Sequence, residues 1–484
     1  MRQAILKIKD EVNLKIDGLE LDARRALMKK FEFEVPGARY MPSVRLGRWN
    51  GKVSYFSLAG STFINLLGEI IPVLEEMHYE IELEDDRDYQ TSFNFTEINT
   101  DSFSHVVWPK GHTHQGQPIK LRDYQVEVIN SFLANPQSIQ EVATGAGKTI
   151  MTAALSSAVE PYGRSIVIVP NKSLVTQTEA DYKNLGLDVG VYFGDRKEYF
   201  KKHTICTWQS LNILLKNTKS GTADCTISEF IEDVVCVMVD EVHMAKADAL
   251  KQLLTGVMSR VPIRWGLTGT IPKAEYERFA LLVSLGDVTN KLSASELQDK
   301  GVLANCHVNI VQLQDGQEFQ NYQAELKHLL TDEKRLDKMC DLIDTIKDSG
   351  NTLVLVDRIN AGQEITKRIK DSVFISGSTK VNERKEEYDE VATADRKVLV
   401  ATYGVASVGI NIPRIFNLVL IEPGKSFVRV IQSIGRGIRK AEDKDFVQIW
   451  DITSSCRFAK RHLTQRKAFY REANYPFVIE KLDY

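Results

Sequence analysis

Runs of consecutive apolar residues, separated by segments of helix length, dominate the chain from about residue 121 onward. Such runs are typical of strands that are buried on both faces of a parallel sheet. In a strand with one solvent-exposed face, apolar and polar residues alternate. A first series of runs lies at 165–170, 203–208, 234–240 and 264–270. Strands that alternate with helices along the chain predict βαβ units.

A second series, in which apolar runs again alternate with segments of helix length, follows between about residues 300 and 455. The sequence therefore predicts an α/β protein with two doubly wound parallel-sheet units in tandem. The runs of this second series lie at 351–357, 372–377, 397–402, 416–422 and 446–451.

The two ends of the chain follow other patterns. The N-terminal part mixes short strand-like runs with one helical stretch near 66–77, which predicts a small α+β module. The stretch 108–120 is rich in Gly, Pro and His and is typical of a linker. The end of the chain is helical in pattern and basic. We therefore expect an N-terminal module (1–110), a first α/β domain (111–290), a second α/β domain (291–455) and a basic helical tail (456–484).

Composition excludes several classes of protein. The chain has 484 residues, of which 43% are hydrophobic and 26% charged, so a disordered chain and a small scaffold that needs cross-links are both excluded. The formal net charge is −3, so any surface that binds nucleic acid must gather its cations locally.

Neither membrane insertion nor secretion is expected. The longest uninterrupted apolar stretch is Val234–Val239, far short of the roughly 20 residues that a membrane-spanning helix needs. Charged residues interrupt the first 17 positions, so they lack the apolar centre of a signal peptide. The six cysteines are widely spaced and none lies in a CxxC pair. We expect a soluble, cytoplasmic protein, which for a viral protein means the host cytoplasm.

The segment ATGAGKT (143–149) carries the sharpest chemical signal. A glycine-rich turn at the end of a strand brings backbone N–H groups to phosphate oxygens, and the helix that follows adds its positive dipole. Lys148 would reach the β- and γ-phosphates and the Thr149 hydroxyl would hold Mg²⁺. The strict pattern has Gly where this chain has Val142, and a chance Gly-Lys-Thr turn is the alternative. The residues that would form the cradle are Thr144, Gly145, Ala146 and Gly147.

The segment VVCVMVDEVH (234–243) predicts a buried strand that ends in two carboxylates. Asp240 would hold Mg²⁺ and Glu241 would polarise an attacking water. The alternative is a solvated acidic pair at the end of a strand. Together with the phosphate cradle, this pair predicts hydrolysis of a nucleoside triphosphate.

The segment QSIGRGIR (432–439) lies in the second unit and places Arg436 and Arg439 on one face of a predicted helix. Guanidinium groups match phosphate oxygens bidentately, so these two side chains could act as arginine fingers on the γ-phosphate when the domains close. A solvated pair of arginines is the alternative.

The ordered set of motifs resembles that of superfamily 2 helicases over about residues 120–455. Within that superfamily, the stretch RYMPSVRLGRWNGKVSYF (39–56) and the overall layout are similar to the UvsW-type helicases of tailed bacteriophages. The motifs that carry the wider resemblance are LRDYQ (121–125), ATGAGKT, IVIVPNKSLVTQ (166–177), TWQS (207–210), DEVH (240–243), LTGT (267–270), ATYGVASVGINIP (401–413) and QSIGRGIR.

The resemblance implies a RecA-like fold for both α/β domains and assigns further roles. Arg122 and Gln125 would read adenine. Gly409 and Asn411 would lie near the nucleotide, although many relatives have Asp in the place of Asn411. The catalytic group would include Gln432, coupling of hydrolysis to movement would involve His243, Thr268 and Thr270, and the nucleic-acid face of the first domain would include Pro170, Lys172, Thr207 and Gln209. For this last group, capping of helices is the alternative.

The N-terminal module offers a second nucleic-acid surface. Residues 35–68 contain no acidic side chain, and the cations Arg39, Arg45 and Arg48 alternate with aromatic residues. Aromatic rings can stack on unpaired bases. The alternative is a small sheet whose aromatic residues form its core. The aromatic residues concerned are Tyr40, Trp49, Tyr55 and Phe56. The basic tail could likewise bind nucleic acid or dock on the acidic stretch 69–88.

The sequence therefore predicts a monomeric, ATP- and Mg²⁺-dependent DNA helicase. By resemblance its substrates would be forks, Holliday junctions and R-loops, in recombination, repair and replication restart by branch migration. Three alternatives stay open: a helicase for RNA or RNA–DNA hybrids, a duplex translocase that separates no strands, and a nucleotide-gated binding module that does not turn over.

Overall fold

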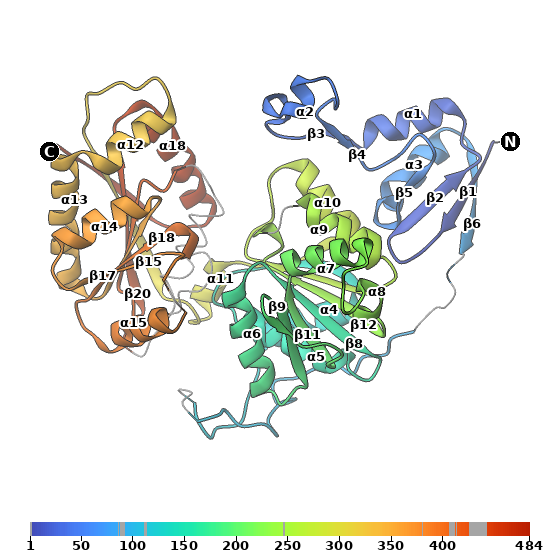
Figure 1. Ribbon diagram of the computed structural model, residues 1–484, viewed down its shortest axis with the longest axis horizontal. Coiled ribbons are helices and arrows are strands. Elements are labelled where there is room, and N and C mark those ends of the chain that lie inside the picture. The colour runs from blue at the N-terminus through green and yellow to red at the C-terminus, as the bar shows by residue number, and fades with distance from the viewer. Residues whose placement is uncertain are drawn as a thin grey trace. The chain divides into compact units, whose positions relative to one another are not determined.

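The computed structural model describes residues 2–85, 87, 92–110, 114–244, 247–379, 381–405, 412, 414–424 and 443–484 (Figure 1). The chain forms two compact units. The first comprises Met1–Val142 and Gly147–Lys291, and the second comprises Ala143–Ala146 and Leu292–Tyr484.

The first unit begins with a four-stranded sheet in the order β5-β2-β1-β6, in which β1 is antiparallel to β2 and parallel to β6. Apolar and polar positions alternate in β1 and β2, so one face of this sheet is buried, as in the predicted α+β module. Its elements are β1 (Arg2–Ile8), β2 (Asn13–Asp17), α1 (Leu21–Lys30), β5 (Ser61–Phe63), α3 (Leu67–Glu76) and β6 (Tyr79–Asp85).

A two-stranded ribbon extends from this module (Figure 1). It consists of β3 (Glu32–Glu34) and β4 (Lys52–Ser54), and the backbone N–H of Val35 donates to the carbonyl oxygen of Gly51 at 2.9 Å. Between the two strands the chain forms two short helical turns, η1 (Ala38–Tyr40) and α2 (Pro42–Arg45). We call residues 35–52 the arm.

The rest of the first unit is an eight-stranded sheet in the order β10-β9-β11-β8-β12-β13-β7-β14. Its central strands are parallel, and the four strands predicted for the first series are confirmed as β8, β11, β12 and β13. The strands are β7 (Gln137–Val142), β8 (Arg164–Val169), β9 (Val189–Phe193), β10 (Arg196–Lys197), β11 (His203–Thr207), β12 (Val234–Asp240), β13 (Ile263–Thr268) and β14 (Asp287–Leu292).

Helices cover both faces of this sheet, as a doubly wound unit requires (Figure 1). One face carries α4 (Asp123–Ala134), α5 (Lys148–Val159) and α6 (Lys172–Asn184). The other face carries α7 (Trp208–Ser220), α8 (Ile227–Phe230), α9 (Ala247–Gln252), the π-helical turn η4 (Leu253–Val257) and α10 (Glu275–Leu285), whose apolar side chains pack on β12 and its neighbours.

The second unit is a parallel seven-stranded sheet in the order β17-β18-β16-β19-β20-β15-β21. All five strands predicted for the second series are confirmed. Its strands are β15 (Asn305–Leu313), β16 (Thr352–Val356), β17 (Ser372–Ile375), β18 (Val398–Thr402), β19 (Asn417–Ile421), β20 (Phe446–Ser454) and β21 (Phe477–Leu482). Its helices are α11 (Ala294–Asp299), α12 (Tyr322–Thr331), α13 (Glu333–Ile346), α14 (Ile359–Arg368), α15 (Val381–Thr393) and α18 (Arg457–Glu472).

The basic tail is an integral part of the second unit. Its predicted helix is confirmed as α18, and the chain then adds β21 beside β15, a strand that was not predicted for residues 477–482. Arg466 anchors α18, because its guanidinium donates to both carboxylate oxygens of Asp451 at 2.8 and 2.9 Å, with both side chains fully buried. The remaining cations of α18 lie mostly on its exposed side.

Two further findings concern the cysteines and the length of the helices. All six cysteines are buried and carry free thiols. Within the part of the chain that the structure describes, no helix has the length and apolar character needed to cross a bilayer.

Candidate ATP and nucleic-acid sites

The predicted phosphate cradle connects β7 to α5. The departure at Val142 has a local explanation, because this residue ends β7 as a buried strand residue and makes no turn. The turn needs glycine later, at Gly145 and Gly147, which have φ values of 94° and 83°. A Cβ atom at Gly147 would also lie 2.7 Å from Nε2 of Gln125. The cradle therefore has its two required glycines at the positions where the backbone is left-handed.

Lys148 is the first residue of α5 and is only 8% exposed. Its Nζ donates to Oε1 of Glu241 at 2.5 Å, so the structure brings together the two motifs from which the sequence predicted nucleoside triphosphate hydrolysis. Both side chains of this ion pair are buried, so removing either one would leave the other as an uncompensated buried charge.

The two carboxylates lie at the carboxyl end of β12. Asp240 is the last residue of the strand, and its Oδ1 accepts the backbone N–H of Glu241 at 2.9 Å. Glu241 has a φ of 53°, a left-handed conformation that costs a residue other than glycine about 1–3 kcal/mol. This turn directs the Glu241 side chain toward Lys148 and away from the continuation of the strand. Strain at this position fits a role in the reaction.

The predicted coupling residues form a hydrogen-bonded chain with Glu241. Nδ1 of His243 lies 2.6 Å from Oγ1 of Thr268, and the Thr268 hydroxyl donates to the carbonyl oxygen of Thr270 at 2.7 Å. The backbone N–H of Gly269 donates to Oε2 of Glu241 at 3.4 Å. A shift of the Glu241 side chain would therefore displace residues at the end of β13, and a shift of those residues would displace Glu241.

The predicted adenine-reading residues cap α4 beside the cradle. The side chain of Gln125 accepts the backbone N–H of Arg122 at 2.9 Å, and Gln125 is 6% exposed. Because Gln125 lies against Gly147, the structure brings the LRDYQ and ATGAGKT motifs together.

Sequence reasoning missed Asp181, an acidic residue of α6 whose carboxylate accepts a hydrogen bond from the Thr149 hydroxyl. Burial raises the pKa of Asp181, and the hydrogen bond from Thr149 opposes that rise. Oxygen atoms of hydroxyl and carboxylate groups suit Mg²⁺, so the donor set of Thr149 and Asp240 fits this ion. No motif signals Asp181, because it lies on α6 beyond the IVIVPNKSLVTQ segment.

The four residues predicted for the nucleic-acid face gather at the ends of β8 and β11. Nε2 of Gln209 donates to the carbonyl oxygen of Pro170 at 3.1 Å, and Lys172 is exposed. The Thr207 hydroxyl oxygen accepts the backbone N–H of Ser210 at 3.3 Å and so caps α7, which is the alternative role considered for this group.

The arm presents cations and rings to solvent. Arg39, Arg45 and Arg48 are exposed, and the Arg39 guanidinium lies 4.8 Å from the centre of the Tyr40 ring. Tyr40 is 65% exposed. Trp49 is half-buried, and its Nε1 donates to the carbonyl oxygen of Lys52. The arm thus has the mixture of charge and exposed aromatic surface that the sequence predicted.

Two aromatic residues of the same stretch do not have the predicted role. Tyr55 is 2% exposed and Phe56 is fully buried, so neither ring can stack on a base. Both belong to the apolar core of the module, which is the alternative that the sequence left open. The two rings are buried instead of exposed because the sheet is small, and its core needs large side chains to exclude water.

Several predicted site residues lie outside the described residues, and they stay predictions. They are Gly409, Asn411, Gln432, Arg436 and Arg439.

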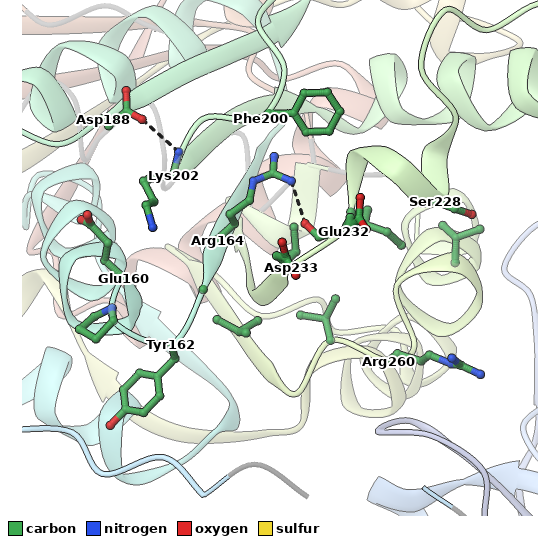
Figure 2. Close-up of a pocket in the computed structure, with 17 residues that line it drawn as sticks. Glu160, Tyr162, Arg164, Asp188, Phe200, Lys202, Ser228, Glu232, Asp233 and Arg260 are labelled. Carbon is green, nitrogen blue, oxygen red and sulfur yellow. Dashed lines mark hydrogen bonds between the residues drawn. The ribbon is translucent and has the colours of Figure 1, made fainter. Parts of the chain in front are cut away.

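A cavity of about 1050 Å³ lies at the opposite edge of the same sheet, where β8 and β12 begin (Figure 2). Arg164 lies at its centre, donating from Nε to the carbonyl oxygen of Lys201 at 3.0 Å and from Nη1 to that of Glu232 at 2.8 Å. These hydrogen bonds connect the start of β8 to the segments that precede β11 and β12. The cavity shares no residue with the ATP motifs. The cavity is therefore not part of the predicted ATP site.

Comparison with known proteins agrees with this geometry. The family described as "Type III restriction enzyme, res subunit" matches residues 118–273, and the family "Helicase conserved C-terminal domain" matches residues 334–441. The first match contains the cradle, the carboxylate pair and the LTGT segment, and the second contains QSIGRGIR. Together with the fold, they make this chain a member of the superfamily 2 helicases, enzymes driven by ATP.

Within that superfamily, the chain is similar to the ATP-dependent DNA helicase UvsW of Enterobacteria phage T4. The two are 23% identical over 461 residues, which cover 91% of this chain and 88% of that protein. This chain is also 22% identical to the DNA 3'-5' helicase XPB of Mycobacterium tuberculosis, over 75% of this chain and 66% of that protein. The solved structure of S. cerevisiae Dbp5 bound to RNA and ADP BeF3 shares the fold, with a TM-score of 0.53, 14% identity and coverage of 75% of this chain and 90% of that one.

Proposed function

We propose that this enzyme is a DNA helicase that acts on branched DNA, namely forks, Holliday junctions and R-loops. Its process would be recombination, repair and replication restart by branch migration. Two named relatives, UvsW of phage T4 and XPB of M. tuberculosis, are DNA helicases. The observation that carries the proposal is that one compact unit holds both the buried Lys148–Glu241 ion pair, with the His243–Thr268 contact beside it, and an exposed cationic, aromatic arm.

The chemistry proposed for the first unit follows from its contacts. Lys148 would leave Glu241 and bind the β- and γ-phosphates of ATP, which frees Glu241 to orient the attacking water. Thr149 and Asp240 would hold Mg²⁺, which neutralises charge on the phosphates when bound. Thr149 would then exchange its hydrogen bond with Asp181 for the metal. Gln125 would read adenine beside Gly147.

The test of this function is a panel of ATPase and strand-separation assays with synthetic forks, four-way junctions, linear duplex, single-stranded DNA, RNA duplex and RNA–DNA hybrid. Forks and four-way junctions are expected to stimulate ATP hydrolysis most and to be remodelled. Stimulation by RNA alone would instead identify an RNA helicase. Stimulation by linear duplex without strand separation would identify a duplex translocase.

The arm provides a second prediction, which concerns DNA affinity. Replacing Arg45 and Arg48 with alanine should weaken fork binding and lower the slope of log K against log salt by about 0.9 for each lost phosphate contact. Titrations of a labelled fork by fluorescence anisotropy at several salt concentrations measure both quantities.

The matched control replaces Arg25 and Lys29, two exposed cations on α1 of the same module, with alanine. An equal loss of affinity in both variants would contradict a specific role for the arm. Deleting the whole module is a less clean test, because Ala280 and Val283 of α10 belong to its core and would become exposed.

A further inference from the structure

Tyr55 joins the N-terminal module to the ATP-binding domain. This residue directly follows β4, and its hydroxyl donates to the carbonyl oxygen of Tyr276 at 2.6 Å. Nζ of Lys251 lies 4.3 Å from the centre of the Tyr55 ring. Tyr276 is in the first turn of α10 and Lys251 is in α9, so one buried side chain contacts two helices of the neighbouring domain.

These two helices are the ones that follow the reactive motifs in the chain. Helix α9 comes after DEVH (240–243), and α10 comes after LTGT (267–270). Val242 and Leu285 both pack against the backbone of Gly266 in β13, where a Cβ atom would lie 3.3 and 3.0 Å from them. Leu285 belongs to α10, Val242 lies next to Glu241, and α9 packs on α10. A displacement of α10, or of α9 through α10, therefore reaches the segments that hold Glu241, His243 and Thr268.

The joint is rigid because further contacts surround it. The Phe33 and Phe279 rings lie 4.4 Å apart, and Nδ2 of Asn65 donates to the carbonyl oxygen of Leu282 at 3.0 Å. Nδ2 of Asn13 donates to the carbonyl oxygen of Thr255, in η4, at 2.9 Å. The module therefore contacts α10 and also η4, which directly follows α9 in the chain.

We infer that Tyr55 is a positioning residue that couples DNA on the arm to the placement of Glu241. DNA that engages the arm shifts α9 and α10 through Tyr55, and these helices shift the hydrogen-bonded chain from Thr268 to Glu241. The inference rests on the proposed function, in which the arm contacts DNA.

Tyr55→Phe tests this coupling in the full-length chain, because it removes the hydrogen bond to α10 and keeps the ring. The DNA-stimulated kcat for ATP hydrolysis is expected to fall about fivefold, the factor for one hydrogen bond used in coupling. The KM for ATP, the basal ATPase rate and the Kd for a fork should stay within twofold of their normal values. A residue with a merely structural role would not lower the stimulated kcat while leaving these three quantities unchanged.

The matched control is Tyr79→Phe, which removes a hydroxyl that accepts the backbone N–H of Glu20 at 3.0 Å inside the same module. It should lower the Tm about as much as Tyr55→Phe and leave the stimulated kcat unchanged. Lys251→Met removes the cation over the Tyr55 ring from the side of α9 and should reproduce the loss of stimulated kcat without altering the module.

Equal stimulated kcat values for Tyr55→Phe, Lys251→Met and Tyr79→Phe would overturn the inference, since Tyr55 would then only pack. A loss of fork affinity in Tyr55→Phe at normal stimulated kcat would also overturn it, because the residue would act in binding. The proposed role of the arm fails separately, since the Arg45 and Arg48 variant reports it through Kd.

Discussion

Replacing Lys148 with alanine is expected to abolish ATP turnover, with kcat lower by about 10²- to 10³-fold. The Lys148 ammonium is the buried cation at the N-terminus of α5, where the phosphates of ATP would be held. Fork binding should persist, because the arm is remote from this residue in the chain and uses other cations. Steady-state ATPase assays with saturating fork DNA measure the loss.

The same substitution removes the ion-pair partner of Glu241, so its effect on folding is measured beside its effect on turnover. Breaking a buried ion pair costs about 3–5 kcal/mol, and thermal unfolding shows whether the variant is folded at the assay temperature. Lys183→Ala is the control, because Lys183 is a cation of α6 whose side chain is 60% exposed in its contact with Glu179. Near-normal turnover in a folded Lys148→Ala variant would refute the assignment of the phosphate cradle.

Replacing Glu241 with glutamine should slow hydrolysis by about 10²- to 10⁴-fold, the usual contribution of a general base. Glutamine keeps an oxygen that can accept the Gly269 N–H and has nearly the same shape, so the fold should survive. ATP should still bind, because Lys148 loses its anionic competitor and meets the phosphates more readily. Single-turnover hydrolysis and binding of a fluorescent ATP analogue separate the two steps.

Glu160→Gln is the matched control for this substitution. Glu160 pairs with His203 at 3.2 Å at the opposite edge of the same sheet, where Figure 2 shows it in the lining of the cavity around Arg164. Unchanged hydrolysis in Glu241→Gln would reject Glu241 as the residue that activates water. Loss of ATP binding together with hydrolysis would show that the carboxylate organises the site and does not act on water.

Much of the fold could be predicted because parallel strands have a strong local signature. Strand β12 is a continuous apolar run, and its predicted bounds agree with the observed Val234–Asp240. Strands β15 and β21 were not predicted, since their sequences include polar positions such as Asn309 and Glu480. Both strands are recognisable only by their pairing with each other and, for β15, with β20.

The candidate site divides in the same way. The motifs identified Lys148 and Glu241, because phosphate and water chemistry demands particular residue types in particular turns. Asp181 and Tyr55 carry no such mark, since an acidic residue in a helix and an aromatic residue near a strand are common everywhere. The stretch around Tyr55 even suggested base stacking, and burial against the first domain corrected that prediction.

By itself, the sequence determined the two tandem α/β units and the order of the ATP motifs, because those properties depend on local periodicity and on turn chemistry. Only the tertiary structure decided that Lys148 meets Glu241, that Thr149 meets Asp181, and that Tyr55 contacts both α9 and α10. The physical reason is that these contacts join residues far apart in the chain, and long-range packing is not encoded in any short window of sequence.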